Sequence, residues 1–359
     1  MVLKNKIIYL KSLYIFFVFL SLIIFFFSTA KGEGKAFEID NIKITTPFEM
    51  NFNKNKVIDD GFKKAFSQLM TLIVNSSEIK KVDRIKLNEI KGMIESFSIK
   101  EEKFINEVYY VNLGVSFNKK KIFNYLEKKN IFPSTPVEKK LLFLPIIIDE
   151  NKKDLLLFSN NEFFNEWLNY NEDNHLIDYI LPTEDLEDLN LLKEKYEILE
   201  QYDFKDITNK YDLNDSIVAL IFKKEKEIRT LSRISIMGKV ILKNQTFSEI
   251  DIENSKQVEN IIKRLKTVYE DYWKSFNQVN TSIKLPIYVK IENSNNSKIS
   301  NFEKTLNHTD LIYNFFISNY DKDFTYYQII FNGTPRNFLE TMSSNGYNFD
   351  TQKRIWALQ

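Results

Sequence analysis

The pattern of apolar and polar positions in the first third of the chain predicts a small module of mixed structure. Alternating apolar residues indicate strands and recurrence every three or four residues indicates helices. The predicted order is strand, helix, helix, strand, helix, over residues 37–44, 57–73, 83–97, 108–117 and 118–129. Gly114 is a candidate β-bulge within the second strand. Pro133 and Pro136 interrupt the pattern and are typical of a connector, so the first module is expected to span 31–132.

The middle of the chain predicts strands that alternate with helices. A continuous apolar run at 141–148 is typical of a strand buried on both faces. The further elements expected are helices at 161–169 and 185–199 and strands at 177–181, 217–222, 229–242 and 246–252. Alternating strands and helices favour a central, partly parallel sheet, which gives an α/β domain over 137–253.

The last part, 254–359, predicts a long helix followed by a compact α+β module. The helix covers 255–277 and carries apolar residues at helical spacing. The elements expected after it are strand 283–291, helix 300–306, strands 311–317 and 326–331, helix 335–344 and strand 353–358. This βαββαβ order is typical of a ferredoxin-like module. Thr334 is its expected helix N-cap, with Pro335 in the first turn and Gly346 near the C-cap.

The first thirty residues have the layout of a secretory signal peptide. Lysines precede an apolar run at 13–27, and Ser28-Thr29-Ala30 resembles a cleavage site. We therefore expect export to the periplasm or an equivalent compartment after cleavage near Ala30. The alternative is an uncleaved anchor in the inner membrane formed by residues 7–27.

Composition narrows the function classes. The 359 residues include 50 Lys plus Arg, 49 Asp plus Glu, two His and no Cys. Loss of 1–30 removes three lysines and no acid, which changes the formal charge from +1 to −2. This balance argues against a nucleic-acid partner. The absence of Cys excludes disulfides, thiol catalysis, thiolate metal sites and a lipidated N-terminal cysteine.

Short motifs in the middle of the chain resemble those of a known family. They are Leu144-Pro145, the Asn161 to Trp167 helix with its aromatic residues, and Asp185-Leu186-Glu187-Asp188. The sequence is similar to a family of secreted bacterial proteins of uncharacterised role, the domain of unknown function two-zero-six-six. Glu184 replaces a glycine in the family pattern. The resemblance covers most of the chain after the leader and implies export and this architecture, but no activity.

The candidate binding residues are Trp167, Asp185, Glu187 and Asp188. Asp185 and Asp188 are three residues apart and share a helix face, where carboxylates can bind a divalent cation or act as an acid/base pair. The alternative is a helix start capped by Thr183, with acids that complement the helix dipole. Trp167 lies either in an apolar ligand pocket or in the core.

These patterns predict an exported cell-envelope protein of binding or scaffold type, with a protein or cell-wall partner. Nucleophile, P-loop and dinucleotide motifs are absent from the sequence. We therefore assign no catalytic residue, metal or cofactor, and expect membrane contact only through the N-terminal segment. The alternative function is a carboxylate-based, metal-dependent binder or hydrolase of an envelope polysaccharide or peptidoglycan.

Overall fold

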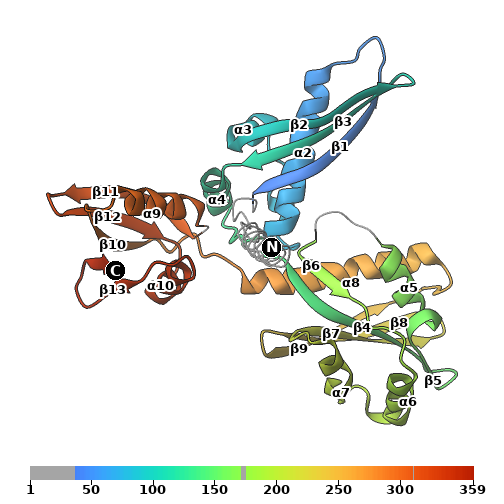
Figure 1. Ribbon diagram of the computed structural model, residues 1–359. Helices are drawn as coiled ribbons and strands as arrows, with labels where there is room; N and C mark the ends of the chain where they lie inside the picture. Colours follow the sequence, from blue (N-terminus) through green and yellow to red (C-terminus); the bar gives the residue numbers. More distant parts are fainter. Residues whose placement is uncertain (1–36, 171–174, 310) are drawn as a thin grey trace, which may run out of the picture. The chain divides into compact units, whose positions relative to one another are not determined.

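The computed structural model describes residues 37–170, 175–309 and 311–359. The predicted signal peptide or anchor, 1–30, lies outside these ranges. Residues 37–359 form one compact unit with three sheets, which confirms the predicted mixed α/β architecture (Figure 1). Within the described ranges, every helix is too short or too polar to cross a bilayer.

The N-terminal module is a three-stranded antiparallel sheet with helices against it. Its elements are β1 (Glu38–Pro47), α2 (Lys54–Ile73), α3 (Leu87–Met93), β2 (Ile94–Ile105), β3 (Val108–Phe117) and α4 (Lys119–Lys128). The sheet order is β1-β3-β2, so β3 is central and β2 forms one edge. The apolar face of α2 packs on the sheet, where Gly61 faces Leu113 and Ile44.

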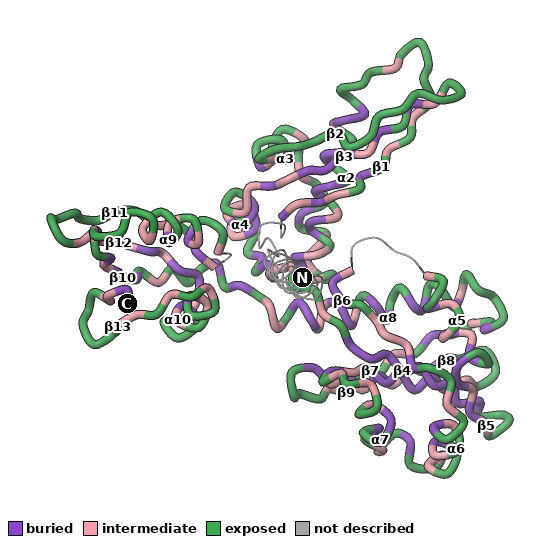
Figure 2. The backbone as a smooth tube through the Cα atoms, in the orientation of Figure 1, coloured by how far each residue is buried: buried purple, intermediate pink, exposed green. Residues whose placement is uncertain are grey.

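The prediction of one helix over 83–97 was wrong, because α3 ends at Met93 and β2 follows directly. Side chains on both faces of β2 are exposed, so its sequence lacks the alternation that marks a half-buried strand (Figure 2). The expected bulge at Gly114 was also wrong. Gly114 itself pairs with Ser98, and the register shifts lie on the neighbouring strands: on β1 between Ile39 and Ile42, opposite Gly114, and on β2 between Ile94 and Ser96 and between Ile99 and Glu101.

The central sheet is mixed, as predicted. Its elements are β4 (Lys139–Asp149), β5 (Asp154–Leu156), α5 (Glu162–Asn169), β6 (Ile177–Ile180), α6 (Leu186–Glu194), α7 (Lys205–Thr208), β7 (Ser216–Lys224), β8 (Glu227–Ile236) and β9 (Lys239–Phe247). The order is β5-β4-β7-β8-β9, with β6 also paired to β4. Strand β4 runs parallel to β6 and β7 and is buried from Leu141 to Asp149, as its apolar run predicted (Figure 2).

Three predicted elements in this domain were wrong. The expected strand at 229–242 is broken by a turn at Met237-Gly238, where both residues have positive φ. Strand β9 therefore spans Lys239–Phe247, and no separate strand forms at 246–252. Helix α6 ends at Glu194, and a short 3₁₀ turn at Tyr196–Ile198 follows it.

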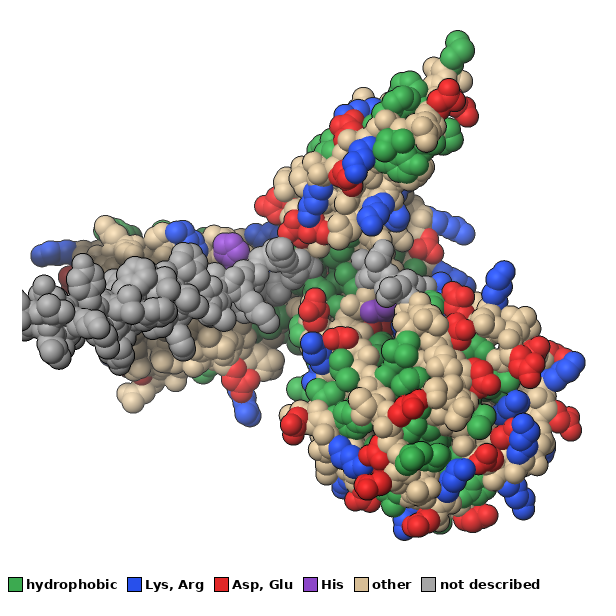
Figure 3. All heavy atoms as spheres, turned by 45° about the vertical axis from the view of Figure 1, so that its right-hand side comes forward, with side chains coloured by type: hydrophobic (Ala, Val, Ile, Leu, Met, Phe, Trp, Pro, Cys, Tyr) green, Lys and Arg blue, Asp and Glu red, His purple; other side chains and the backbone are tan. Residues whose placement is uncertain are grey.

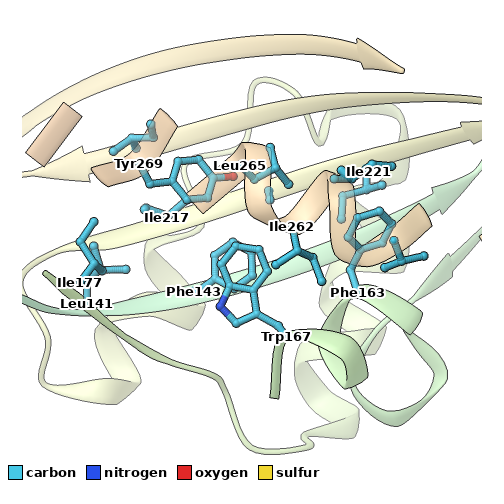
Figure 4. Close-up of a cluster of buried hydrophobic side chains, with 14 of the residues drawn as sticks. Leu141, Phe143, Phe163, Trp167, Ile177, Ile217, Ile221, Ile262, Leu265 and Tyr269 are labelled. Atoms are coloured by element: carbon cyan, nitrogen blue, oxygen red, sulfur yellow. The ribbon is translucent and has the colours of Figure 1, made fainter. Parts of the chain in front are cut away.

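Helix α8 (Ser255–Phe276) packs on the central sheet. One core lies between the sheet, α5 and α8, and includes Phe143, Trp167 and Tyr269 (Figure 4). A second core on the other face includes Leu144 of β4 and Leu192 of α6. Successive side chains of β4 thus pack into opposite cores, because side chains alternate between the two faces of a strand.

The C-terminal module keeps the predicted order but ends differently. It contains β10 (Leu285–Glu292), α9 (Asn296–His308), β11 (Ile312–Tyr320), β12 (Phe324–Phe331), α10 (Pro335–Ser344), β13 (Phe349–Asp350) and β14 (Trp356–Leu358). Thr334 caps α10 as expected, and Gly346 has φ +83°. In place of one closing strand, β14 pairs parallel to β10 and β13 pairs with β14.

Two helical glycines provide a test of the packing in the N-terminal module. A Cβ at Gly61 would clash with the Cδ1 of the buried Leu113, whereas a Cβ at Gly92 would meet nothing within 4 Å. We expect Gly61→Ala to lower the free energy of unfolding by about 1–2 kcal/mol through overpacking. Gly92→Ala should raise it by about 0.5–1 kcal/mol through helix propensity. Urea denaturation measures both, and equal stabilisation would show that α2 does not pack this closely on β3.

Candidate functional site

The acidic stretch forms the start of helix α6. Asp185, rather than the expected Thr183, is the N-cap, and its Oδ1 accepts a hydrogen bond of 2.8 Å from the Glu187 backbone N–H. Glu184 Oε1 accepts a hydrogen bond from the Ser159 N–H. Acids at this position favour the helix because they face the positive end of its dipole. The local geometry therefore has the form of a helix cap.

A lysine distant in sequence neutralises the two aspartates. Lys210 Nζ lies 2.9 Å from Asp185 Oδ2 and 2.6 Å from Asp188 Oδ1. Asp188 is buried, whereas Glu187 is exposed. The hydrogen bond from Lys210 lowers the pKa of Asp185, and Asp188 and Asp185 together raise the pKa of Lys210. Among the described residues, no group of three or more acidic or histidine side chains is placed to hold a metal ion.

Trp167 lies in the core on the other face of the central sheet. Its ring stacks on Phe143 at a centroid distance of 3.8 Å (Figure 4). It also meets the Tyr179 ring edge-on at a centroid distance of 5.2 Å. Asp185 and Asp188 belong to α6, which packs on the opposite face. The four candidate residues are therefore not brought together, and Trp167 does not line a site shared with the carboxylates.

A buried charged row on α8 was missed in the sequence. Lys266, Glu270 and Lys274 recur every four residues and are each more than nine-tenths buried. Lys266 Nζ lies 4.5 Å from the centroid of the Tyr170 ring and 5.2 Å from that of Trp167. These distances are those of cation–π contacts. The signal was present as charges at i, i+4 and i+8 along the apolar face of a predicted helix.

Glu270 fixes the start of β6. Its carboxylate accepts hydrogen bonds from the backbone N–H groups of Leu176 (3.2 Å) and Ile177 (2.9 Å). Burial raises the pKa of Glu270, and these hydrogen bonds oppose the rise. His175 Nδ1 lies 3.9 Å from Glu270 Oε1. The carboxylate thus joins α8 to β6 inside the domain.

An exposed apolar surface, which we call the apolar tip, was also missed. It consists of Phe48, Met50, Phe104 and Ile105, from the β1–α2 loop and the end of β2. The Phe48 and Phe104 rings lie 4.6 Å apart at their centroids, and both side chains are about half exposed. Figure 3 shows hydrophobic side chains gathered at the outer end of this sheet. The sequence signal was two apolar residues, Phe48 and Met50, in the loop that follows Pro47, the last residue of β1.

The chain matches no family model and no curated protein. The family resemblance and the export that it implies therefore stay predictions.

The Lys210 pairs predict a pH-dependent contribution to stability. The folded pKa of Asp185 is lowered, so its contribution is present above the unfolded pKa and is lost as the pH falls through the folded value. We expect Lys210→Met to lower the melting temperature at pH 7, with a difference from wild type that narrows on acidification. Scanning calorimetry from pH 7 to pH 3 measures this. Lys224→Met on β7 is the control, and a difference that does not change with pH would contradict the pairing.

The contribution of Glu270 to stability is expected to depend on pH in the opposite sense. Its folded pKa is raised, so its contribution is fully present below the unfolded pKa and is lost as the pH rises through the folded value. Glu270→Gln replaces the titratable carboxyl group with a neutral amide. We therefore expect wild type to lose stability relative to this variant as the pH rises above 4.5. Urea denaturation at several pH values checks this, and parallel stability curves would exclude the raised pKa.

Proposed function

We propose that the chain is an exported cell-envelope protein of binding or scaffold type that acts through the surfaces of its domains. The predicted leader and the resemblance to a secreted family support export. The protein would act in the periplasm after cleavage near Ala30, or from the inner membrane if residues 7–27 stay attached.

The apolar tip is the observation that carries the binding role. Met50 is fully exposed, and Phe48, Phe104 and Ile105 are each about half exposed. Solitary exposed apolar residues are ordinary, but the Phe48 and Phe104 rings come from two adjoining segments, contact each other and so form a shared apolar surface. Such surfaces mark contacts with other molecules, because covering them removes apolar area from water.

Charges around the tip indicate the chemistry of the partner. Lys54 Nζ lies 2.6 Å from Glu102 Oε1, and Lys103 pairs with Glu101, so these four charges are balanced. Glu49 in the β1–α2 loop and Glu107 in the β2–β3 turn add negative charge nearby. A protein surface with an apolar pocket and basic residues at its border complements this arrangement.

Photo-crosslinking from the tip tests this role. A crosslinking residue at Met50 should capture one defined envelope protein in cells, whereas the same residue at Leu242, an exposed position on β9, should not. The purified partner should then bind the variant Phe48→Ser/Met50→Ser about tenfold or more weakly, because two apolar side chains no longer become buried. Val240→Ser/Leu242→Ser is the matched control. Equal affinity of both variants would rule out the tip as the binding surface.

A metal-dependent role of Asp185 and Asp188 is the second proposal, as a binder or hydrolase of an envelope polysaccharide or peptidoglycan. The observation in its favour is that Asp188 Oδ2 is buried and accepts no hydrogen bond from the described residues. A cation at this position must displace the Lys210 ammonium. Calorimetric titration with Ca²⁺ and Mg²⁺ should therefore give more heat for Lys210→Met than for wild type. Absence of heat from both proteins would end this proposal.

A further inference from the structure

Strand β2 presents an open sheet edge. It pairs with β3 on one side, β3 pairs with β1 on its other side, and the sheet ends at β2. Every residue from Glu95 to Ile105 is exposed (Figure 2). Backbone groups along such an edge are available to pair with another strand, and natural proteins usually protect them.

One face of β2 is also incompletely covered. Phe97, Ile99 and Phe104 lie opposite Val115, Leu113 and Tyr109 of β3, which are buried on the side of α2. Helix α2 lies over β3 and β1, because Gly61 faces Leu113 and Ile44. The Phe97 and Phe104 side chains are therefore 50% and 56% exposed although they point to the helix side.

The register shift makes this edge complementary to itself. A strand alternates its faces, so Phe97 and Phe104, seven residues apart, would normally point to opposite faces. The shift between Ile99 and Glu101 adds one residue and brings both to the same face. In an antiparallel pair of β2 strands, Phe97 of one copy can then lie opposite Phe104 of the other with both side chains on the helix side.

The same register places opposite charges at the centre of the pair. Lys100 lies across from Glu101 of the second copy, and two-fold symmetry repeats the contact. Lys100 already bonds Asp40 across Gly114, and Glu101 bonds Lys103, but an ammonium has further donors and a carboxylate further acceptors. Ile99 lies across from Glu102, whose carboxylate is held by Lys54 and Tyr109.

We propose that two copies of this chain associate through β2, antiparallel, into a continuous sheet of order β1-β3-β2-β2-β3-β1. The occupant of the edge is a second copy because the two central charge pairs and the two Phe97–Phe104 pairs all arise from one register. The interface uses Phe104, which also belongs to the apolar tip, whereas Phe48 and Met50 of the tip lie outside β2.

Sedimentation equilibrium of the chain from Lys31, which contains the whole compact unit 37–359, tests the association. Wild type should show a concentration-dependent dimer. In a homodimer of either Lys100→Glu or Glu101→Lys, like charges face each other at both central contacts. We therefore expect the dimer dissociation constant of each variant to be about tenfold higher than that of wild type. An equimolar mixture of the two variants should recover the dimer. In the mixed dimer the two substituted side chains have opposite charges and face each other, and the unsubstituted Lys100 and Glu101 form the second pair.

The mixture also separates the interface from folding. In the mixture, Lys100→Glu still lacks its ion pair with Asp40, and Glu101→Lys still lacks its ion pair with Lys103. Recovery of the dimer can therefore come only from contacts between the copies. Lys239→Glu on β9 has the same charge change outside β2 and should leave the dimer unaffected. The proposal would be overturned if wild type stayed monomeric at all concentrations. It would also be overturned if the mixture of the two variants dimerised no more strongly than each variant alone.

Discussion

The burial of charge on helix α8 is the constraint on which the structure around the central sheet depends. Taking a charged group out of water costs several kcal/mol unless it is paired. Lys266 faces aromatic rings, Glu270 receives two backbone N–H groups at β6, and Lys274 donates to the carbonyl of Val74 at the end of α2. Asp271 accepts hydrogen bonds from Ser76. The partners of α8 thus come from two regions far from it in the sequence: the end of α2 at 74–76, and α5 with the start of β6, at 167–170 and 176–177.

The contacts of these buried charges also show how the candidate residues differ in role. Trp167 belongs to the aromatic set around Lys266, so its ring serves the buried charge and the core at the same time. Asp185 and Asp188 lie on the other face of the sheet with their own counterion, Lys210. Exposed apolar side chains without a place in either of these cores occur in the N-terminal module, among them Phe48, Met50 and Phe104.

The sequence was informative where burial or capping left a local pattern. Strand β4 was predicted from a continuous apolar run, helices α2 and α8 from apolar residues at helical spacing, and the start of α10 from its capping residues. Strand β2 was missed because both of its faces are exposed, so only its pairing with β3 fixes it. The state of the Asp185–Asp188 carboxylates was undetermined for a different reason. It depends on Lys210, which is 22 residues from Asp188 and carries no local pattern.

The length of β2 has a geometric consequence. The strand has twelve residues, which at about 3.4 Å per residue corresponds to roughly 40 Å. The apolar tip lies at one end of this strand, so a two-fold axis near Lys100 would carry a second tip to the opposite end of the joined sheet. A dimer of this kind would hold two partner molecules at a fixed separation, facing away from each other. Such a dimer would join partner molecules that lie on two separate surfaces, and it would not bring two partners together on the same surface.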